Sequence, residues 1–159
     1  MTMRSMKRFE DDMDDRTAES KIPLPALLSQ AKDITTDLLH RRLAEEGFEG
    51  LRYRHGSVFR FIDAEGSRLT VLAERSRLSK QAIGEVVDEL EGYGYVERTA
   101  DPADRRAKII RLTELGRKGQ LAAARVLRDI EQEWAAHLGQ DRIVTVRATL
   151  EQIIAMHTG

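Results

Sequence analysis

The sequence predicts a mainly α-helical protein with a small β wing: a winged helix-turn-helix accompanied by N- and C-terminal dimerisation helices. Charged residues make up 33% of the 159 residues and aromatic residues only 5%, a composition typical of helix-rich chains. Apolar residues recur at spacings of three and four along most of the chain, which is the period of an amphipathic helix. Residues 69–113 differ, because two short helical segments joined by a tight turn precede two extended runs and a charged loop.

The composition excludes several classes of function. The chain has no cysteine, which excludes disulfides, thiolate metal sites and sensing by thiol oxidation. The four histidines show no metal-ligand spacing, so we expect them to be solvated or to cap helices, with a histidine-centred metal site as the minor alternative. No cofactor is expected, and the absence of a nucleophile–base motif or a glycine-rich phosphate loop argues against an enzyme. With no apolar run near the length of a membrane span and no signal-peptide region, we expect a cytoplasmic protein.

The first 22 residues are acidic and contain too few apolar side chains to offset the entropy cost of folding on their own. We expect a mobile tail, and an arm that packs on a partner subunit is the alternative. From Pro23 and Pro25 onwards, apolar residues recur at helical spacing as far as Leu39, and proline is tolerated in the first turn of a helix. A first amphipathic helix is therefore predicted here.

A second helical segment is predicted over residues 51–63, with Gly66 ending it. It mixes arginines and a histidine with aromatic residues. One interpretation is the wall of a pocket for an acidic aromatic ligand. The other, which is the commoner arrangement, is a half-buried helix with a solvated basic face.

The next two segments predict the helix-turn-helix. Residues 69–75 form a short helix, the chain turns at residues 76–77, and the hydroxyl of Ser79 is well suited to cap a second helix. The apolar positions of that helix fall at i, i+3, i+4 and i+7: Ile83, Val86, Val87 and Leu90. The polar positions consequently lie toward the other side, namely Lys80, Gln81, Gly84, Glu85 and Asp88.

Residues 95–99 and 107–112 are predicted to form two adjacent strands, and the sequence ADPADRR between them begins with a turn signal. Arg105 and Arg106 are expected at the tip of this loop. Asp104 is expected to orient one of these arginines or to pair with Arg98. Two strands with a charged loop form a wing.

Thr113 is expected to cap a long helix that runs to about Leu138, where Gly139 separates it from a last amphipathic helix. A helix of about 25 residues spans about 38 Å, which is longer than a winged domain can cover. Its far half, the last helix and the first helix each carry an apolar stripe that needs a partner. A helical bundle shared by two subunits satisfies all three stripes.

The predicted organisation is a tail over 1–22, a dimerisation helix and a second helix over 23–66, a DNA-binding region over 67–113, and a long linker helix with a C-terminal dimerisation helix over 114–159. Residues 67–118 carry eleven basic and nine acidic side chains, so charge alone does not indicate nucleic acid. The placement of individual residues has to support that function.

The polar residues of the second helix of the pair are placed to bind DNA. Ser79, Lys80 and Gln81 lie at a helix N-terminus, where the helix dipole and free amides favour phosphate. Gln81 can also pair bidentately with adenine. Arg105 or Arg106 can enter an adjacent minor groove, although an exposed charge without a contact is the simpler interpretation of any single arginine. Two such helices in a two-fold dimer predict a palindromic operator of double-stranded DNA.

Residues 69–118 resemble the MarR family of multiple-antibiotic-resistance regulators, through LSKQAIGEVVDELEGYGYVER and DPADRRAKIIRLTELGR, in which DRR, an aliphatic strand and LTxxG form a fairly specific signature. The resemblance covers about residues 24–157 in organisation. It implies a homodimeric transcriptional regulator, usually a repressor whose binding to DNA is weakened by a phenolic or other aromatic acid. The candidate DNA-binding residues are Ser79, Lys80, Gln81, Ala82, Gly84, Glu85, Arg98, Asp104, Arg105 and Arg106. The candidate pocket residues, by their position on helices that form pocket walls in the family, are Arg52, Tyr53, His55, Phe59 and Trp134.

The chain departs from the family pattern in three respects. Many members have a small hydroxyl residue followed by a basic residue where Gly84 and Glu85 stand here, and a glutamate repels phosphate but can accept a hydrogen bond from cytosine. Arg77 occupies a turn position more often held by glycine, which indicates either backbone strain or an added phosphate contact. The lack of cysteine excludes the peroxide-sensing branch.

We therefore expect a homodimeric, sequence-specific regulator of transcription, in the form of a repressor that a small aromatic or phenolic ligand releases. The alternative is a protein-interaction module that uses the winged fold without binding an operator, with Glu85 discouraging DNA.

Overall fold

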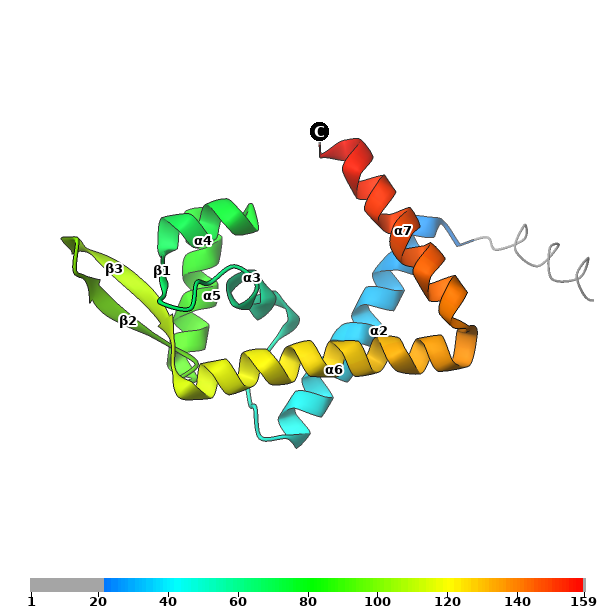
Figure 1. Cartoon of the computed structure of the whole chain (residues 1–159), viewed down its shortest axis with the longest axis horizontal. Coiled ribbons are helices and arrows are strands. Elements are labelled where there is room, and N and C mark those ends of the chain that lie inside the picture. The colour runs from blue at the N-terminus through cyan, green and yellow to red at the C-terminus, as the bar shows by residue number, and fades with distance from the viewer. Residues whose placement is uncertain (1–21, 159) are drawn as a thin grey trace, which may run out of the picture. The chain divides into compact units, whose positions relative to one another are not determined.

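The structure is a computed structural model that describes residues 22–158 (Figure 1). The chain divides into two compact units, one that ends at Thr35 and one that begins at Thr36. Of the first unit, the structure describes residues 22–35, and the predicted tail lies outside the described residues except for its last residue.

The first unit contributes the N-terminal part of helix α2 (Leu24–Glu45). Pro25 lies in the first turn, where its missing N–H costs no hydrogen bond, and the carbonyl of Pro23 accepts from the amides of Ala26 and Leu27. This confirms the predicted first helix. Four apolar side chains of this unit's helix are exposed: Leu24, Leu27, Leu28 and Ile34.

The second unit contains the winged helix-turn-helix and the C-terminal helices. In order, it comprises the end of α2, the 3₁₀ turn η1 (Tyr53–His55), α3 (Gly56–Phe59), β1 (Ser67–Arg68), α4 (Leu69–Ser76), α5 (Lys80–Gly92), β2 (Val96–Asp101), β3 (Asp104–Leu112), α6 (Glu114–Leu138) and α7 (Gln140–His157). None of the helices in the described part of the chain is both long and apolar enough to cross a membrane.

The prediction of one helix over residues 51–63 is wrong, because this segment forms only η1 and the short α3. Two side chains capture backbone amides that a continuous helix would use. His55 Nδ1 accepts from the amide of Arg52, which keeps Arg52 extended at φ −126° and ψ 157°. Further on, Ser67 Oγ accepts from the amide of Asp63. Local hydrogen bonds of this kind compete with helix formation.

The helix-turn-helix follows the prediction closely. Ser79 Oγ accepts from the amide of Ala82 at 3.0 Å and so caps α5. Arg77 ends α4 with φ 57° and ψ 27°, the left-handed conformation that favours glycine. The expected backbone strain at this turn is therefore present, at a cost of about 1 kcal/mol.

The wing is an antiparallel sheet with the strand order β1-β3-β2, so it has a third strand that the sequence did not predict. Its hairpin is also tighter than expected. β2 and β3 remain paired up to Asp101 and Asp104, which leaves only Pro102 and Ala103 at the tip. Arg105 and Arg106 therefore lie on strand β3, and the prediction that they occupy the tip is wrong.

The core of the second unit joins the helix-turn-helix to α6. The buried side chains that fill it come from α2, α4, α5, the sheet and α6, and include Leu43, Leu72, Ile83, Leu90, Ile110 and Ile130. Thr113 links the wing to α6, because its amide donates to the carbonyl of Tyr95 and its Oγ1 caps the helix by accepting from the amide of Gly116 at 3.0 Å.

Gly116 permits this close approach. A Cβ atom at this position would lie 1.8 Å from the carbonyl oxygen of Tyr95, so only glycine fits there. This accounts for the glycine in the LTxxG signature. It places the start of α6 directly against the start of β2.

We expect Gly116→Ala to lower the free energy of unfolding by about 3 kcal/mol or more, because the added methyl group meets backbone rather than a movable side chain. Gly92→Ala is the matched control, since nothing lies within 4 Å of its added Cβ and alanine favours a helix. Denaturant unfolding of both variants measures the difference. Equal stability of the two variants would contradict the proposed close packing.

Candidate nucleic-acid interface

The exposed face of α5 presents the residues predicted to read DNA. The apolar side chains Ile83, Val87 and Leu90 are completely buried, which fixes the rotation of the helix about its axis. Ser79, Lys80, Gln81 and Glu85 are exposed in consequence, with Ala82 and Gly84 partly exposed. The N-terminal turn therefore combines a positive helix dipole with polar side chains that solvent can reach.

The wing is stiffened at its turn by a buried carboxylate. Asp101 is only 5% exposed; its Oδ1 accepts from the amide of Ala103 at 2.9 Å, and its Oδ2 accepts from Arg68 Nε of β1 at 2.7 Å. These hydrogen bonds, led by the one from Ala103, lower the pKa of the Asp101 carboxyl. Strand β1 thus holds the turn of the hairpin in place through Arg68.

Arg105 and Arg106 are both exposed on β3. They are consecutive residues of a strand, so their side chains point to opposite faces of the sheet. Asp104 does not pair with Arg98, which was one of its two expected roles. Its Oδ1 accepts from the backbone amide of Arg106 at 3.0 Å, which fixes the backbone and leaves the arginine side chain available.

Arg98 is held within the protein instead. Its two terminal nitrogens donate to Asp88 Oδ1 at 2.6 Å and Glu91 Oε1 at 2.7 Å, both on α5. This pairing ties β2 to α5. A contact from Arg98 to DNA would first have to break it.

An apolar cavity of about 160 Å³ lies between α2, the η1–α3 segment and α6. Of the predicted pocket residues, Arg52, Tyr53 and Phe59 line it, whereas His55 and Trp134 do not. Its remaining walls are formed by Leu39, Leu43, Leu51, Gly56, Arg60, Gln120, Ala123, Ala124 and Leu127. The surface of the cavity is therefore almost wholly apolar, and Arg52 and Arg60 are the two charged residues that line it.

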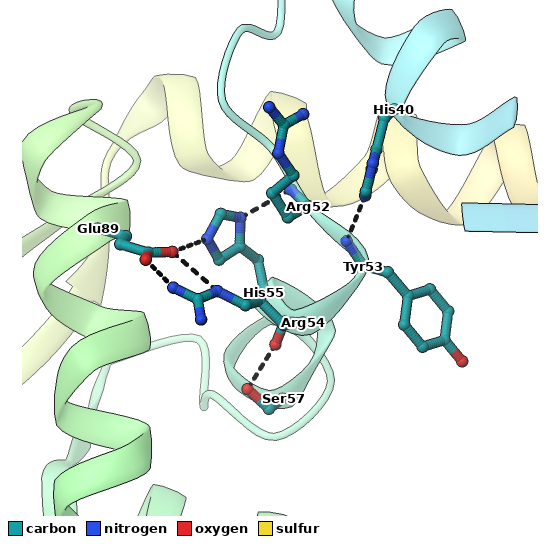
Figure 2. A network of polar contacts seen from close by, with 7 residues as sticks. All are labelled: His40, Arg52, Tyr53, Arg54, His55, Ser57 and Glu89. Carbon is teal, nitrogen blue, oxygen red and sulfur yellow. Dashed lines mark hydrogen bonds and ion pairs between the residues drawn. The ribbon is translucent and has the colours of Figure 1, made fainter. Parts of the chain in front are cut away.

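His55 lies at the centre of a polar network that joins the cavity lining to α5 (Figure 2). The side chain is 1% exposed, so of the two expected roles, solvated or capping, His55 has the capping one, at the start of η1. Its Nδ1 accepts from the amide of Arg52 at 2.9 Å, which requires this nitrogen to be unprotonated. Nε2 consequently carries the proton and donates to Glu89 Oε2 at 3.0 Å.

Burial, followed by the charges of Arg54 and Arg52, lowers the pKa of His55 to about 4. The ring is therefore neutral at pH 7. Glu89 receives further donors from Arg54, whose Nε lies 3.0 Å from Glu89 Oε2 and whose terminal nitrogen contacts Oε1. The carboxylate of Glu89 thus binds α5 to residues 54–55.

A second cavity of about 520 Å³, whose lining has a larger polar share than that of the first, opens beside this network. It shares Arg52 and Tyr53 with the apolar cavity. Its other lining residues are Thr36, His40, Gly50, Arg54, Glu89 and Tyr93. No group of three or more histidine or acidic side chains able to hold a metal ion occurs among residues 22–158.

Glu89, Arg68 and Asp101 are the functional candidates that the sequence did not reveal. Each acts through a partner more than 30 residues away, as in Arg68 with Asp101 and Arg54 with Glu89. The only local signal is the position of Glu89, which flanks the buried stripe of α5 and is partly buried itself. Such a carboxylate needs a donor, but the pattern does not identify which one.

Comparison with known proteins shows which regulators this chain resembles. A family model described as the MarR family matches residues 49–107. An uncharacterized HTH-type transcriptional regulator, YdcH of Bacillus subtilis (strain 168), is 30% identical over 112 residues, which cover 69% of this chain and 76% of that protein.

Two solved structures of regulators named CouR are also similar. CouR from Rhodococcus jostii RHA1, bound to p-coumaroyl-CoA, is 31% identical with a TM-score of 0.61, covering 82% of this chain and 90% of that chain. The transcriptional repressor CouR bound to a 23-mer DNA duplex is 26% identical with a TM-score of 0.68, covering 83% of this chain and 92% of that chain.

The low pKa of His55 predicts a specific pH dependence of stability. The unfolded chain binds a proton at His55 below its ordinary pKa of about 6.5, whereas the folded chain does so only near pH 4. Stability is therefore full above about pH 6.5 and falls by up to about 3 kcal/mol as the pH drops toward 4.

His55→Gln is the test, because glutamine can accept from the Arg52 amide and donate to Glu89 without titrating. We expect its unfolding free energy to depend less steeply on pH between 4 and 6.5 than that of the wild type. Urea unfolding across this range measures both slopes. Parallel curves would show that His55 does not carry the effect.

Proposed function

Because the chain belongs to the MarR family of transcriptional regulators, and is therefore a DNA-binding regulator, we propose that it acts as a homodimeric, sequence-specific repressor that a small aromatic effector releases. The observation that carries the proposal is the exposed, capped N-terminus of α5 beside a wing with two available arginines. The alternative of a protein-interaction module has no comparable support.

The DNA contacts divide into positioning and reading. Ser79 and Lys80 bind phosphate at the helix N-terminus, and Gln81 pairs with adenine in the major groove. Glu85, also exposed on this face, accepts a hydrogen bond from cytosine. The base preference of this protein therefore differs from that of a regulator with a phosphate-binding residue at the same position. One of Arg105 and Arg106 enters the adjacent minor groove.

The C-terminal helix supports the proposed dimer. α7 has no buried residue, and most of its apolar side chains are exposed, among them Val144, Val146, Ile154 and Met156. These side chains form a surface that a second copy covers, and the exposed leucines at the start of α2, in the first unit, are apolar surface that also needs a partner. A two-fold dimer then presents two reading helices about one turn of DNA, roughly 34 Å, apart.

The apolar cavity supports an aromatic effector. Its volume of about 160 Å³ and its leucine and phenylalanine walls suit a planar ring, with Arg52 and Arg60 at the lining to attract an acidic group. The relative CouR was solved with p-coumaroyl-CoA, an aromatic thioester. We propose aromatic acids or their thioesters as the effector class.

Replacing Arg105 and Arg106 together by alanine is expected to weaken operator binding roughly 10- to 100-fold at moderate salt, because the wing loses its groove contact. The slope of log affinity against log salt should fall by about 1 for each arginine that contacts phosphate. Fluorescence anisotropy with a palindromic duplex, selected from random DNA, measures both quantities.

The control is Arg41→Ala with Arg128→Ala, which removes the same charge from exposed positions on α2 and α6. Full affinity of the Arg105/Arg106 variant, or an equal loss in the control, would refute the wing contact. A duplex with a single half-site should bind much more weakly than the palindrome, and equal binding would argue against the dimer.

Ala124→Phe is expected to fill the apolar cavity and reduce the response to effector at least 10-fold, while operator binding without effector is preserved. The measurement is release of the operator by 4-hydroxycinnamate and by its coenzyme A thioester. Ala44→Phe, at an exposed position of α2 outside the cavity lining, is the control. An unchanged response of Ala124→Phe would place the effector elsewhere.

A further inference from the structure

Arg77 has a backbone conformation that a glycine would adopt more readily. Among the residues that the structure describes, it is the only one other than glycine with a positive φ, at φ 57° and ψ 27°. This left-handed conformation is unfavourable for a residue that carries a Cβ atom, but not for glycine. Residues held in such conformations are concentrated at functional sites. The arginine at this position therefore needs an explanation other than the stability of the backbone.

The hydrogen bonds of the turn require the left-handed conformation but not the arginine side chain. The amide of Leu78 donates to the carbonyl of Ala73 at 3.2 Å, and the amide of Arg77 donates to the carbonyl of Glu74 at 3.2 Å. Together these two bonds form the Schellman motif, which ends a helix at a left-handed residue that is usually glycine. A glycine at position 77 would therefore keep the turn and remove the strain.

The charge of Arg77 is not used within the described part of the chain. The side chain is exposed, and it makes no ion pair within residues 22–158. Arg75, two residues earlier, differs, because its guanidinium donates to Asp63 at 2.9 Å and to the carbonyl of Phe61 at 2.8 Å. The folded chain thus binds the guanidinium of Arg75 and leaves that of Arg77 available to a ligand.

The place of the turn in the fold indicates which ligand this charge can meet. In a helix-turn-helix, the second helix enters the major groove by its N-terminal end, while the first helix crosses the phosphate backbone. Arg77 joins α4 to α5 two residues before the cap Ser79, and residues 77–81 are all exposed. The turn is thus the point at which the chain passes from the phosphates to the groove.

We propose that Arg77 binds a phosphate of the operator, and that the strained turn is retained because it presents this guanidinium to DNA. A phosphate contact positions the protein without reading the sequence, and a planar guanidinium can donate to two phosphate oxygens at once. The proposal rests on the proposed function of operator binding. It deepens that function by adding an affinity-determining residue from outside α5 and the wing.

Arg77→Gly is expected to change stability and DNA affinity in opposite directions. The unfolding equilibrium constant should fall about three-fold or more, so that the urea midpoint rises, because the strain at position 77 is relieved. The affinity for DNA should fall about ten-fold, and the slope of log affinity against log salt should fall by about 2 per dimer, because one phosphate contact is lost from each subunit. An arginine that stabilises the fold through the α4 dipole would instead give a lower midpoint.

Urea unfolding and fluorescence anisotropy are measured on the full-length wild type, Arg77→Gly, Arg77→Lys and Arg128→Ala. The DNA is the palindromic duplex selected from random sequences and a scrambled duplex of the same length. Arg77→Lys keeps both the charge and the strain, so its midpoint should match the wild type and its affinity should stay within about two-fold. Arg128→Ala is the control for charge, because Arg128 is exposed on α6 and makes no ion pair in the described part of the chain.

The loss in Arg77→Gly should be the same factor on both duplexes, since a phosphate is present in either sequence. A loss confined to the palindrome would assign base reading to Arg77 and overturn the phosphate contact. Unchanged affinity of Arg77→Gly, or an equal loss in Arg77→Lys or Arg128→Ala, would overturn it as well. A lower urea midpoint for Arg77→Gly would overturn the inference that the strain is retained for DNA binding.

The two duplexes separate failure of this inference from failure of the proposed function. If the wild type binds the palindrome no more tightly than the scrambled duplex, the sequence-specific repressor is wrong, and the scrambled duplex still tests the phosphate contact. If the wild type prefers the palindrome and Arg77→Gly binds both duplexes as tightly as the wild type does, the repressor stands and the role of Arg77 is wrong.

Discussion

The burial of one stripe of α5 is the constraint on which the rest of the structure depends. Ile83, Val87 and Leu90 are inaccessible to solvent, and a helix with three such anchors cannot rotate about its axis without exposing apolar surface. The outward direction of Gln81 and Glu85 follows from this burial alone. The exposure of the polar face of α5 is thus determined by the side chains that are buried on its opposite face.

Two sets of polar contacts then fix where this helix lies. On one side, Arg98 joins its C-terminal half to β2, and on the other, Glu89 joins it to residues 54–55. The contacts differ in character, because Arg98 is bound by two carboxylates whereas Glu89 is bound to one exposed arginine and one buried histidine.

Periodicity and capping residues were sufficient to predict the regular elements. The stripes and the caps at Ser79 and Thr113 are local signals, and the helices they predict are present. The segment over residues 51–63 could not be predicted, because its conformation follows from His55 capturing an amide three residues earlier. Strand β1 was missed because two residues that pair with a distant strand carry no periodicity.

The candidate site, like the fold, could be predicted only where local signals determine it. Polar residues at the start of α5 were found, because the cap and the apolar stripe together determine their exposure. The partners of Arg98, Asp101 and Glu89 were not, because side-chain pairing across 7 to 35 residues depends on the packed fold rather than on spacing. Of the predicted pocket wall, Arg52, Tyr53 and Phe59 share a lining, while Trp134 lies too far along α6 and instead borders a groove with α7.

The two adjacent arginines on β3 affect how the wing tolerates a shift in strand register. The hairpin already contains an irregularity between Ala100 and Asp101, and a shift of register by one residue exchanges the two faces of a strand. Because Arg105 and Arg106 are neighbours, such a slip would replace one arginine by the other on the same face. The doubled arginine is therefore a form of redundancy, by which a short insertion or deletion in the turn alters the reach of the wing without depriving it of a cation.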